Sequence, residues 1–127
     1  MPDGSLFHIR IRALNGDLTS TPLTAALLAS VGYYHERGRW HCRLFLLMPD
    51  HLHALLSFPI EPGMSQTIRA WKAYHARVHG LVWQDGYFDH RLRNEAEIDA
   101  KAHYIRANPV VKGLCATPQD WPHTWPR

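Results

Sequence analysis

The segment from Phe45 to Phe58 constrains the fold more than any other part of the sequence, because two apolar runs flank the dipeptide Pro49-Asp50. Apolar runs on either side of a turn signal predict two strands joined by a tight connection. Strands joined in this way pair antiparallel, which excludes a purely parallel sheet. The rest of the chain therefore has to complete an antiparallel sheet and cover it.

A His-x-His pair lies directly after this turn. Side chains alternate between the two faces of a strand, so His51 and His53 are expected on one face while Leu52 points into a core. Two imidazoles at this spacing can converge on one metal ion. The alternative is a half-buried, solvated pair at the edge of a sheet. Ten histidines among 127 residues make chance His-x-His pairs common, so the spacing alone leaves both readings open.

Hydrophobic periodicity predicts the other elements of the chain. Alternation from Phe7 to Leu14 predicts a strand with a basic outer face that carries His8, Arg10 and Arg12. Further strands are expected over Trp40–Met48, over His51–Phe58 and within residues 81–92. Helical spacing and helix start signals predict helices over Pro22–Arg37, Met64–His79 and Glu95–Ala107.

Particular residues indicate where these helices end and which side they bury. Gly80 is expected to end the second helix, and Asn94 to cap the third. The third helix should stop near Asn108, because a proline follows. The proline-rich tail is expected to hold little regular structure. The apolar side of the second helix is expected to consist of Met64, Ile68, Trp71, Tyr74 and Val78. Together these elements predict an α+β fold, an antiparallel sheet flanked by helices.

Length and composition bound the class of protein. A chain of 127 residues with 46% hydrophobic residues predicts one domain over residues 1–127. Its net charge of +3 permits nucleic-acid binding without requiring it. Two cysteines, Cys42 and Cys115, make no disulfide framework, and residues 1–5 show no signal-peptide pattern. No apolar run reaches the roughly 18 residues of a membrane span. These features predict a cytoplasmic protein.

A second group of polar residues lies on the third predicted helix. Tyr104 and Asn108 are four residues apart, and Lys101 precedes Tyr104 by three, so a phenol, a carboxamide and an amine share one helix face. The alternative is structural: a half-buried tyrosine with its hydroxyl at the rim, beside an asparagine that caps the helix end.

Together with the histidine pair, three later motifs indicate a family. The pair is followed by Trp71-Lys72-Ala73-Tyr74, by the Trp-Gln-x-Gly-Tyr pattern within residues 82–93, and by the segment from Tyr104 to Val110 that reads Tyr-Ile-x-x-Asn-Pro-Val. In the order and spacing of these motifs, from about residue 6 to Trp125, the chain resembles the single-tyrosine HUH transposases. REP-associated tyrosine transposases are the members that it resembles most.

The resemblance implies both a fold and a chemistry. The fold is an antiparallel sheet flanked by helices, with a ferredoxin-like or RRM-like HUH nuclease core. In the family, a histidine pair holds a divalent metal ion and a helix tyrosine attacks single-stranded DNA beside a hairpin, leaving a 5′-phosphotyrosine. Carried over here, His51 and His53 are metal ligands, Asn108 stands where a third polar ligand is often found, and Tyr104 is the nucleophile. Mg²⁺ prefers oxygen ligands, so two histidines make Mn²⁺ an equally good candidate.

The resemblance also indicates partners and leaves two competing functions. The candidate DNA contacts are basic residues in the family-like stretches, Lys72, Arg91 and Arg93, together with Lys101. A nucleic-acid-binding relative without catalysis is one alternative, and an unrelated metal-dependent hydrolase with a structural Tyr104 is the other. No membrane partner is expected, and the family includes both homodimers and monomers.

Overall fold

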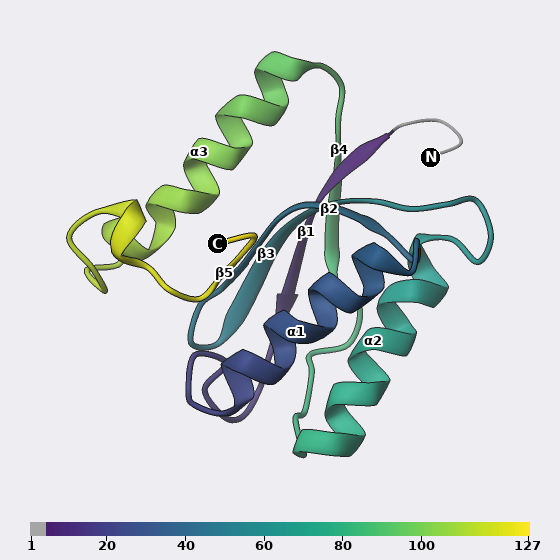
Figure 1. The fold of residues 1–127 in the computed structure, drawn as a ribbon, viewed down its shortest axis with the longest axis horizontal. Helices are drawn as coiled ribbons and strands as arrows, with labels where there is room; N and C mark the ends of the chain where they lie inside the picture. Colours follow the sequence, from purple (N-terminus) through teal and green to yellow (C-terminus); the bar gives the residue numbers. More distant parts are fainter. Residues whose placement is uncertain (1–4) are drawn as a thin grey trace.

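Five strands pair antiparallel into one sheet in the computed structural model, which describes residues 5–127 (Figure 1). Their order across the sheet is β4-β1-β3-β2-β5. The strands are β1 (Leu6–Arg12), β2 (His41–Leu47), β3 (His51–Ser57), β4 (Phe88–Leu92) and β5 (Thr124–Trp125). The expected hairpin is confirmed as β2 and β3, which pair next to the Pro49-Asp50 turn. Residues 1–4, part of the segment searched for a signal peptide, lie outside the described residues.

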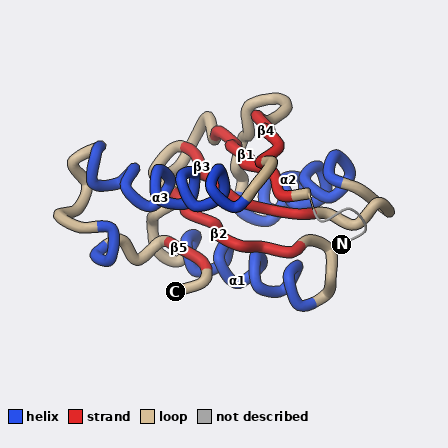
Figure 2. Tube along the Cα trace, turned by 90° about the horizontal axis from the view of Figure 1, so that it is seen from above, coloured by secondary structure: helices blue, strands red, loops and turns tan. Residues whose placement is uncertain are grey.

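Within residues 5–127, three α-helices cover the two faces of this sheet. On one face, Leu27 and Trp71 of two helices join Leu52 of β3 in a common core. On the opposite face, Ile105 of the third helix packs against Leu55 of β3. The helices are α1 (Leu23–Glu36), α2 (Met64–His79) and α3 (Glu95–Val111). Figure 2 shows α1 and α3 on opposite sides of the sheet, and the predicted α+β fold is confirmed.

Within residues 5–127, none of the helices combines the length and the hydropathy needed to cross a membrane.

Strand β1 alternates as its sequence predicts, with one exception. Ile9 and Ile11 are buried in the core under α1 and α2, whereas Arg10 and Arg12 are exposed on the other face. His8 shares that other face but is only 4% exposed, so the predicted basic outer face is wrong at this position. The reason is that the rings of neighbouring residues pack against His8 from the adjacent strands.

Helix α2 has the predicted bounds, and it ends at Gly80 in the left-handed conformation with φ +70°. Its predicted apolar side is only partly right, because Tyr74 is 47% exposed and Val78 is 51% exposed. His75 is buried instead, and its Nε2 lies 2.9 Å from Ser30 Oγ of α1. The second half of α2 therefore turns a polar residue toward its neighbouring helix.

Helix α3 begins as predicted, because Asn94 Oδ1 accepts a hydrogen bond from the backbone N–H of Glu97 at 2.9 Å. The predicted end near Asn108 is wrong, since the helix continues through Pro109 to Val111. A proline inside a helix costs about 3 kcal/mol. Here Asn108 and Pro109 are both buried, and Asn108 contacts His53 of β3, so that tertiary packing offsets the missing backbone donor.

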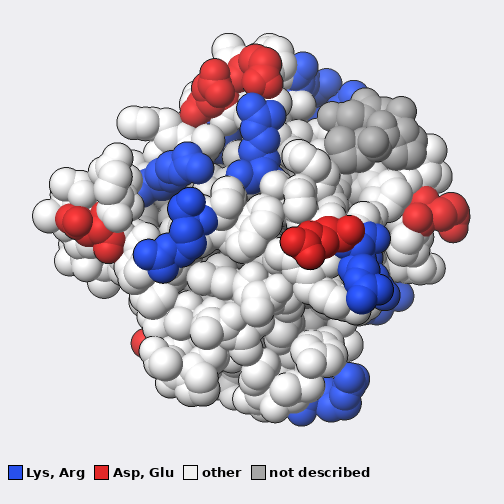
Figure 3. Space-filling view, viewed as in Figure 1, with Lys and Arg blue, Asp and Glu red and all other residues white. Residues whose placement is uncertain are grey.

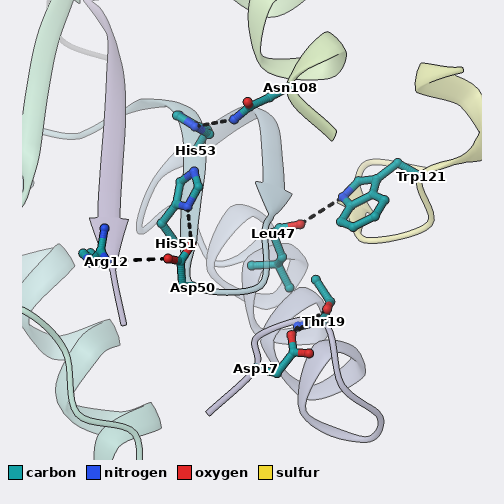
Figure 4. Close-up of polar contacts among 9 residues, drawn as sticks. All are labelled: Arg12, Asp17, Thr19, Leu47, Asp50, His51, His53, Asn108 and Trp121. Atoms are coloured by element: carbon teal, nitrogen blue, oxygen red, sulfur yellow. Dashed lines mark hydrogen bonds and ion pairs between the residues drawn. The ribbon is translucent and has the colours of Figure 1, made fainter. Parts of the chain in front are cut away.

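The tail holds more regular structure than its prolines indicate. β5 pairs with β2, and a short 3-10 helix spans Pro118–Asp120. Between them, Trp121 Nε1 donates to the carbonyl of Leu47 at 2.9 Å (Figure 4). The tail therefore adds the fifth strand of the sheet.

Candidate active site

His51 and His53 lie on the face of the sheet that α3 covers. Leu52, between them, belongs to the opposite core, so the predicted alternation is confirmed. The two imidazole centroids are 5.0 Å apart, and the ring planes are nearly perpendicular. Figure 4 shows Asn108 reaching down from α3 toward His53, with His51 nearer the turn.

Both ring nitrogens of His53 have partners, and the side chain is only 2% exposed. Nε2 lies 3.0 Å from Asn108 Nδ2, and Nδ1 lies 3.0 Å from His8 Nε2. An amide nitrogen can only donate, so Nε2 of His53 accepts and the proton of the neutral ring sits on Nδ1. His53 then donates that proton to His8. The contact with Asn108 thus sets the tautomer of His53.

His51 is held from the other side by the turn that precedes it. Its Nδ1 lies 2.8 Å from Oδ1 of Asp50, whose other oxygen is 3.6 Å from Arg12 (Figure 4). This hydrogen bond lowers the pKa of Asp50, so the carboxylate stays ionised and accepts from the ring. Nε2 of His51 is thereby left available as a ligand. A carboxylate behind a histidine is the arrangement that orients imidazoles in metal sites.

The donor set of this site fits a divalent metal ion. Burial, and then the neighbouring His51, lower the pKa of His53 to about 3, so the ring is neutral, as a ligand must be. Within residues 5–127 no three His, Cys, Asp or Glu side chains form a metal-binding group. The third protein donor would be Asn108, because rotation of its amide exchanges Nδ2 for Oδ1. Two imidazole nitrogens and one amide oxygen suit Mn²⁺ and are acceptable for Mg²⁺.

Tyr104 projects from α3 beside this donor set. Its ring centroid is 6.3 Å from that of His53, and the residue is 55% exposed. Lys101 Nζ lies 5.0 Å from the centroid of the tyrosine ring, so the predicted grouping on one helix face is confirmed. More than half of Tyr104 is therefore exposed to solvent while its ring stays next to His53.

The four predicted DNA contacts lie in different surroundings. Lys101 is beside Tyr104, but Lys72 Nζ donates to the carbonyls of Gln84 and Gly86 at 3.0 and 2.8 Å. Burial lowers the pKa of Lys72, consistent with this role as a clamp for the loop.

The remaining two, Arg91 and Arg93, lie at and just beyond the end of β4. Arg91 pairs in register with Phe7, which packs against the core of α1 and α2. Arg91 therefore projects to the face of the sheet away from the histidine pair. Arg93 is exposed after the strand, and its backbone N–H donates to Glu97 at 2.7 Å.

Two arginines that the predicted site omits lie beside the histidine pair. In the register of β1 with β3, Arg10 stands opposite His53 and Arg12 stands opposite His51. The alternation of β1 was readable from the sequence, but not that β1 is the neighbour of β3. The face of the molecule seen in Figure 3 is of mixed charge, with Lys and Arg in separate groups among Asp and Glu.

Comparison with known proteins gives the following relatives. No protein-family model matches the chain. A REP-associated tyrosine transposase of Escherichia coli K12 is 24% identical over 119 residues, which cover 91% of this chain and 72% of that protein. A second curated relative, from Haemophilus influenzae, is 23% identical over 95 residues, 61% of this chain and 54% of the relative. This chain thus aligns with about half the length of the second relative.

A solved structure of a REP-associated tyrosine transposase bound to a REP hairpin matches the fold with a TM-score of 0.80 at 22% identity. The match covers 95% of this chain and 76% of the solved one. The resemblance to REP-associated tyrosine transposases, and the fold that it implies, are confirmed by these comparisons.

Proposed function

We propose that this chain cleaves and rejoins single-stranded DNA beside a hairpin, as a single-tyrosine HUH transposase with Tyr104 as the nucleophile. One observation carries the proposal: Tyr104 and Asn108 of α3 converge with His51 and His53 of β3 on one face of the sheet. The REP hairpin in the solved relative supports a DNA hairpin as the partner. On this proposal residues 1–127 form one HUH transposase-like domain.

The proposed reaction is a transesterification at a phosphodiester. Oη of Tyr104 attacks the phosphorus atom, and the bond from phosphorus to the 3′ oxygen breaks. The products are a 5′-phosphotyrosine and a free 3′ hydroxyl. The phenol gives up one proton and the departing 3′ oxygen takes up one. Because the phosphotyrosine ester conserves the energy of the broken bond, a 3′ hydroxyl can reverse the attack without ATP.

The residues around Tyr104 have separate tasks in this reaction. His51, His53 and Asn108 would hold a divalent metal ion, which when bound neutralises charge on a non-bridging phosphate oxygen. Asp50 fixes the imidazole of His51 through its Nδ1, and His8 fixes that of His53 through its Nδ1. Lys101 places a positive charge beside the ring on which negative charge grows as the phenol loses its proton.

The test is to trap the covalent intermediate. The protein is incubated with single-stranded hairpin DNA and Mn²⁺, and the products are separated on a denaturing gel and identified by mass spectrometry. We expect a nucleotide adduct on the peptide that contains Tyr104, and no adduct in Tyr104→Phe. Tyr74→Phe is the matched control, because Tyr74 is similarly exposed at 47% but lies on α2.

The two competing functions give different results in the same experiment. Binding of hairpin DNA without cleavage or adduct would show a nucleic-acid-binding relative that has lost catalysis. Cleavage without an adduct, unchanged in Tyr104→Phe, would show a hydrolase in which water is the nucleophile. An adduct on another tyrosine would overturn the assignment of Tyr104.

A further inference from the structure

A cleft of about 560 Å³ opens directly beside His51. Arg10, Arg12, His51 and Phe88 line it from the sheet, and residues 84–87 line it from the other side. Its volume lies within the range of sites that hold small-molecule ligands or single building blocks of a polymer. The cleft adjoins the proposed catalytic group but contains neither Tyr104 nor Asn108.

The sheet side of the cleft carries two guanidinium groups, and that of Arg12 lies 3.6 Å from the carboxylate of Asp50. Arg10 and Arg12 stand opposite His53 and His51, and side chains opposite each other in antiparallel strands have Cβ atoms about 4.5–5.5 Å apart. Both arginines are exposed. A phosphate held near the histidine pair would therefore have its neighbouring phosphate within reach of a guanidinium group.

An aromatic ring stands at the same place. Phe88 of β4 is opposite Arg10 in the sheet, and the Arg10 guanidinium lies 5.1 Å from the ring centroid. Phe88 is 44% exposed and, among the described residues, belongs to neither hydrophobic core. The ring contacts His8, with centroids 5.6 Å apart, and Arg10, and nearly half of the residue remains exposed. A base can stack on such a ring or on the planar guanidinium that covers it.

The opposite wall is held in place before any ligand binds. Lys72 Nζ bonds the carbonyls of Gln84 and Gly86, and the carbonyl of Lys72 itself accepts from Trp83 Nε1 at 2.9 Å. These contacts fix both ends of the loop that faces Phe88. A cleft with fixed walls avoids the cost of ordering them on binding. Asp85 on this wall disfavours a second phosphate there and offers an acceptor to a base amino group.

We propose that this cleft binds one unpaired nucleotide of the DNA strand, next to the phosphate at the histidine pair, with its base against Phe88 and Arg10 and its phosphate toward Arg12. The inference rests on the proposed function. An unpaired base can offer its face to a side chain, whereas a base inside a duplex is stacked between its neighbours. The cleft therefore selects a single strand beside the hairpin rather than the hairpin stem.

The test measures binding without chemistry. In Tyr104→Phe without divalent metal, the probe is a DNA stem-loop with oligothymidine flanks, and its affinity is measured by fluorescence anisotropy. A single abasic site is moved along the flanks. We expect one abasic position to weaken binding about tenfold. Adding Phe88→Ala to the Tyr104→Phe protein should weaken binding of the intact probe by a similar factor and remove the sensitivity to that position.

A matched pair of residues at the C-terminal end of α1 provides the control. Tyr33 is 50% exposed, and the Arg37 guanidinium lies 4.7 Å from its ring centroid, much as Arg10 covers Phe88. Tyr33→Ala and Arg37→Gln should leave both the affinity and the abasic profile unchanged, whereas Arg10→Gln should weaken binding.

The outcomes distinguish nucleotide binding in the cleft from DNA cleavage by Tyr104. An unchanged abasic profile in Phe88→Ala would overturn the proposal that the cleft binds a nucleotide. This holds even where the parent protein forms its adduct at Tyr104. Loss of the abasic sensitivity in Phe88→Ala alone would support the cleft, even where no adduct forms. Equal losses in Phe88→Ala and Tyr33→Ala would also overturn it, since they would indicate general surface stacking.

Discussion

His8 Nε2 lies 3.0 Å from His53 Nδ1, and the two ring planes are only 18° apart. The amide of Asn108 requires Nε2 of His53 to accept, so the proton between the two rings belongs to Nδ1 of His53. His8 then carries its own proton on Nδ1, a buried atom without a hydrogen-bond partner within residues 5–127. His8 thus retains an unsatisfied donor while it provides the acceptor that orients His53. An acceptor behind an imidazole fixes the nitrogen that faces a metal ion.

The first prediction concerns this acceptor. His8→Leu removes it, and we expect the affinity for Mn²⁺, measured by isothermal titration calorimetry, to fall about 10- to 100-fold. His8→Gln places an amide oxygen at a similar reach and should retain most of the affinity.

The control for this prediction is a second buried histidine. His75 is 1% exposed, and its Nδ1 also lacks a partner within the described part of the chain, but it lies on α2. His75→Leu should lower the stability of the fold without changing the affinity for Mn²⁺. An equal loss of affinity in His8→Leu and His75→Leu would mean that His8 serves the fold only.

The second prediction separates the amide from the histidines as ligands. Asn108→Ala leaves the buried Nε2 of His53 without its donor, so we expect the free energy of unfolding to fall by about 1–3 kcal/mol. Calorimetry should show weaker Mn²⁺ binding in Asn108→Ala and none in His53→Ala. Unchanged Mn²⁺ affinity in Asn108→Ala, or binding retained in His53→Ala, would contradict the donor set.

Local patterns predicted those parts of the fold that depend on neighbouring residues. The alternation around Leu52 placed His51 and His53 on one face, and Gly80 and Asn94 marked helix ends where the structure has them. Each of these signals acts through backbone geometry within a few residues.

Other features depend on contacts between distant segments and could not be predicted in this way. Proline at position 109 indicated the end of a helix, but the packing of Asn108 and Pro109 carries α3 past it. The sequence predicts His8 on a solvated face, because it does not show that β1 lies beside β3. The same strand order brings Arg10 and Arg12 to the histidine pair, while the preferred candidate Arg91 faces away.

The third prediction tests whether Lys72 contacts DNA or holds the loop. Each phosphate contact contributes about 0.7 to the slope of log affinity against log salt for a single strand. Since Lys72 Nζ already bonds two carbonyls, Lys72→Met should leave this slope unchanged while the free energy of unfolding falls by about 1 kcal/mol. Arg12→Gln should reduce the slope. A smaller slope in Lys72→Met would restore Lys72 as a phosphate contact.

The fourth prediction concerns the pH dependence of stability. Burial, and then the neighbouring His79, lower the pKa of His75 to about 4, whereas a histidine in the unfolded chain titrates near 6.5. Between these pH values the unfolded chain binds a proton that the folded protein does not. The contribution of His75 is therefore fully present above about pH 6.5, and it falls by up to about 1.4 kcal/mol per pH unit as the pH drops toward 4.

His75→Gln isolates this contribution, because glutamine retains a donor for Ser30 Oγ but does not titrate. Urea unfolding of the parent and the variant is followed at a series of pH values from 7 down to 4, in metal-free buffer. Other buried histidines add to the slope of both proteins, so the difference between the two curves reports His75 alone. We expect the free energy of unfolding of the variant to fall less steeply with falling pH. The two slopes should differ by up to about 1.4 kcal/mol per pH unit, which corresponds to one proton. Parallel curves would show that His75 titrates alike in the folded and unfolded chain, against its burial between α1 and α2.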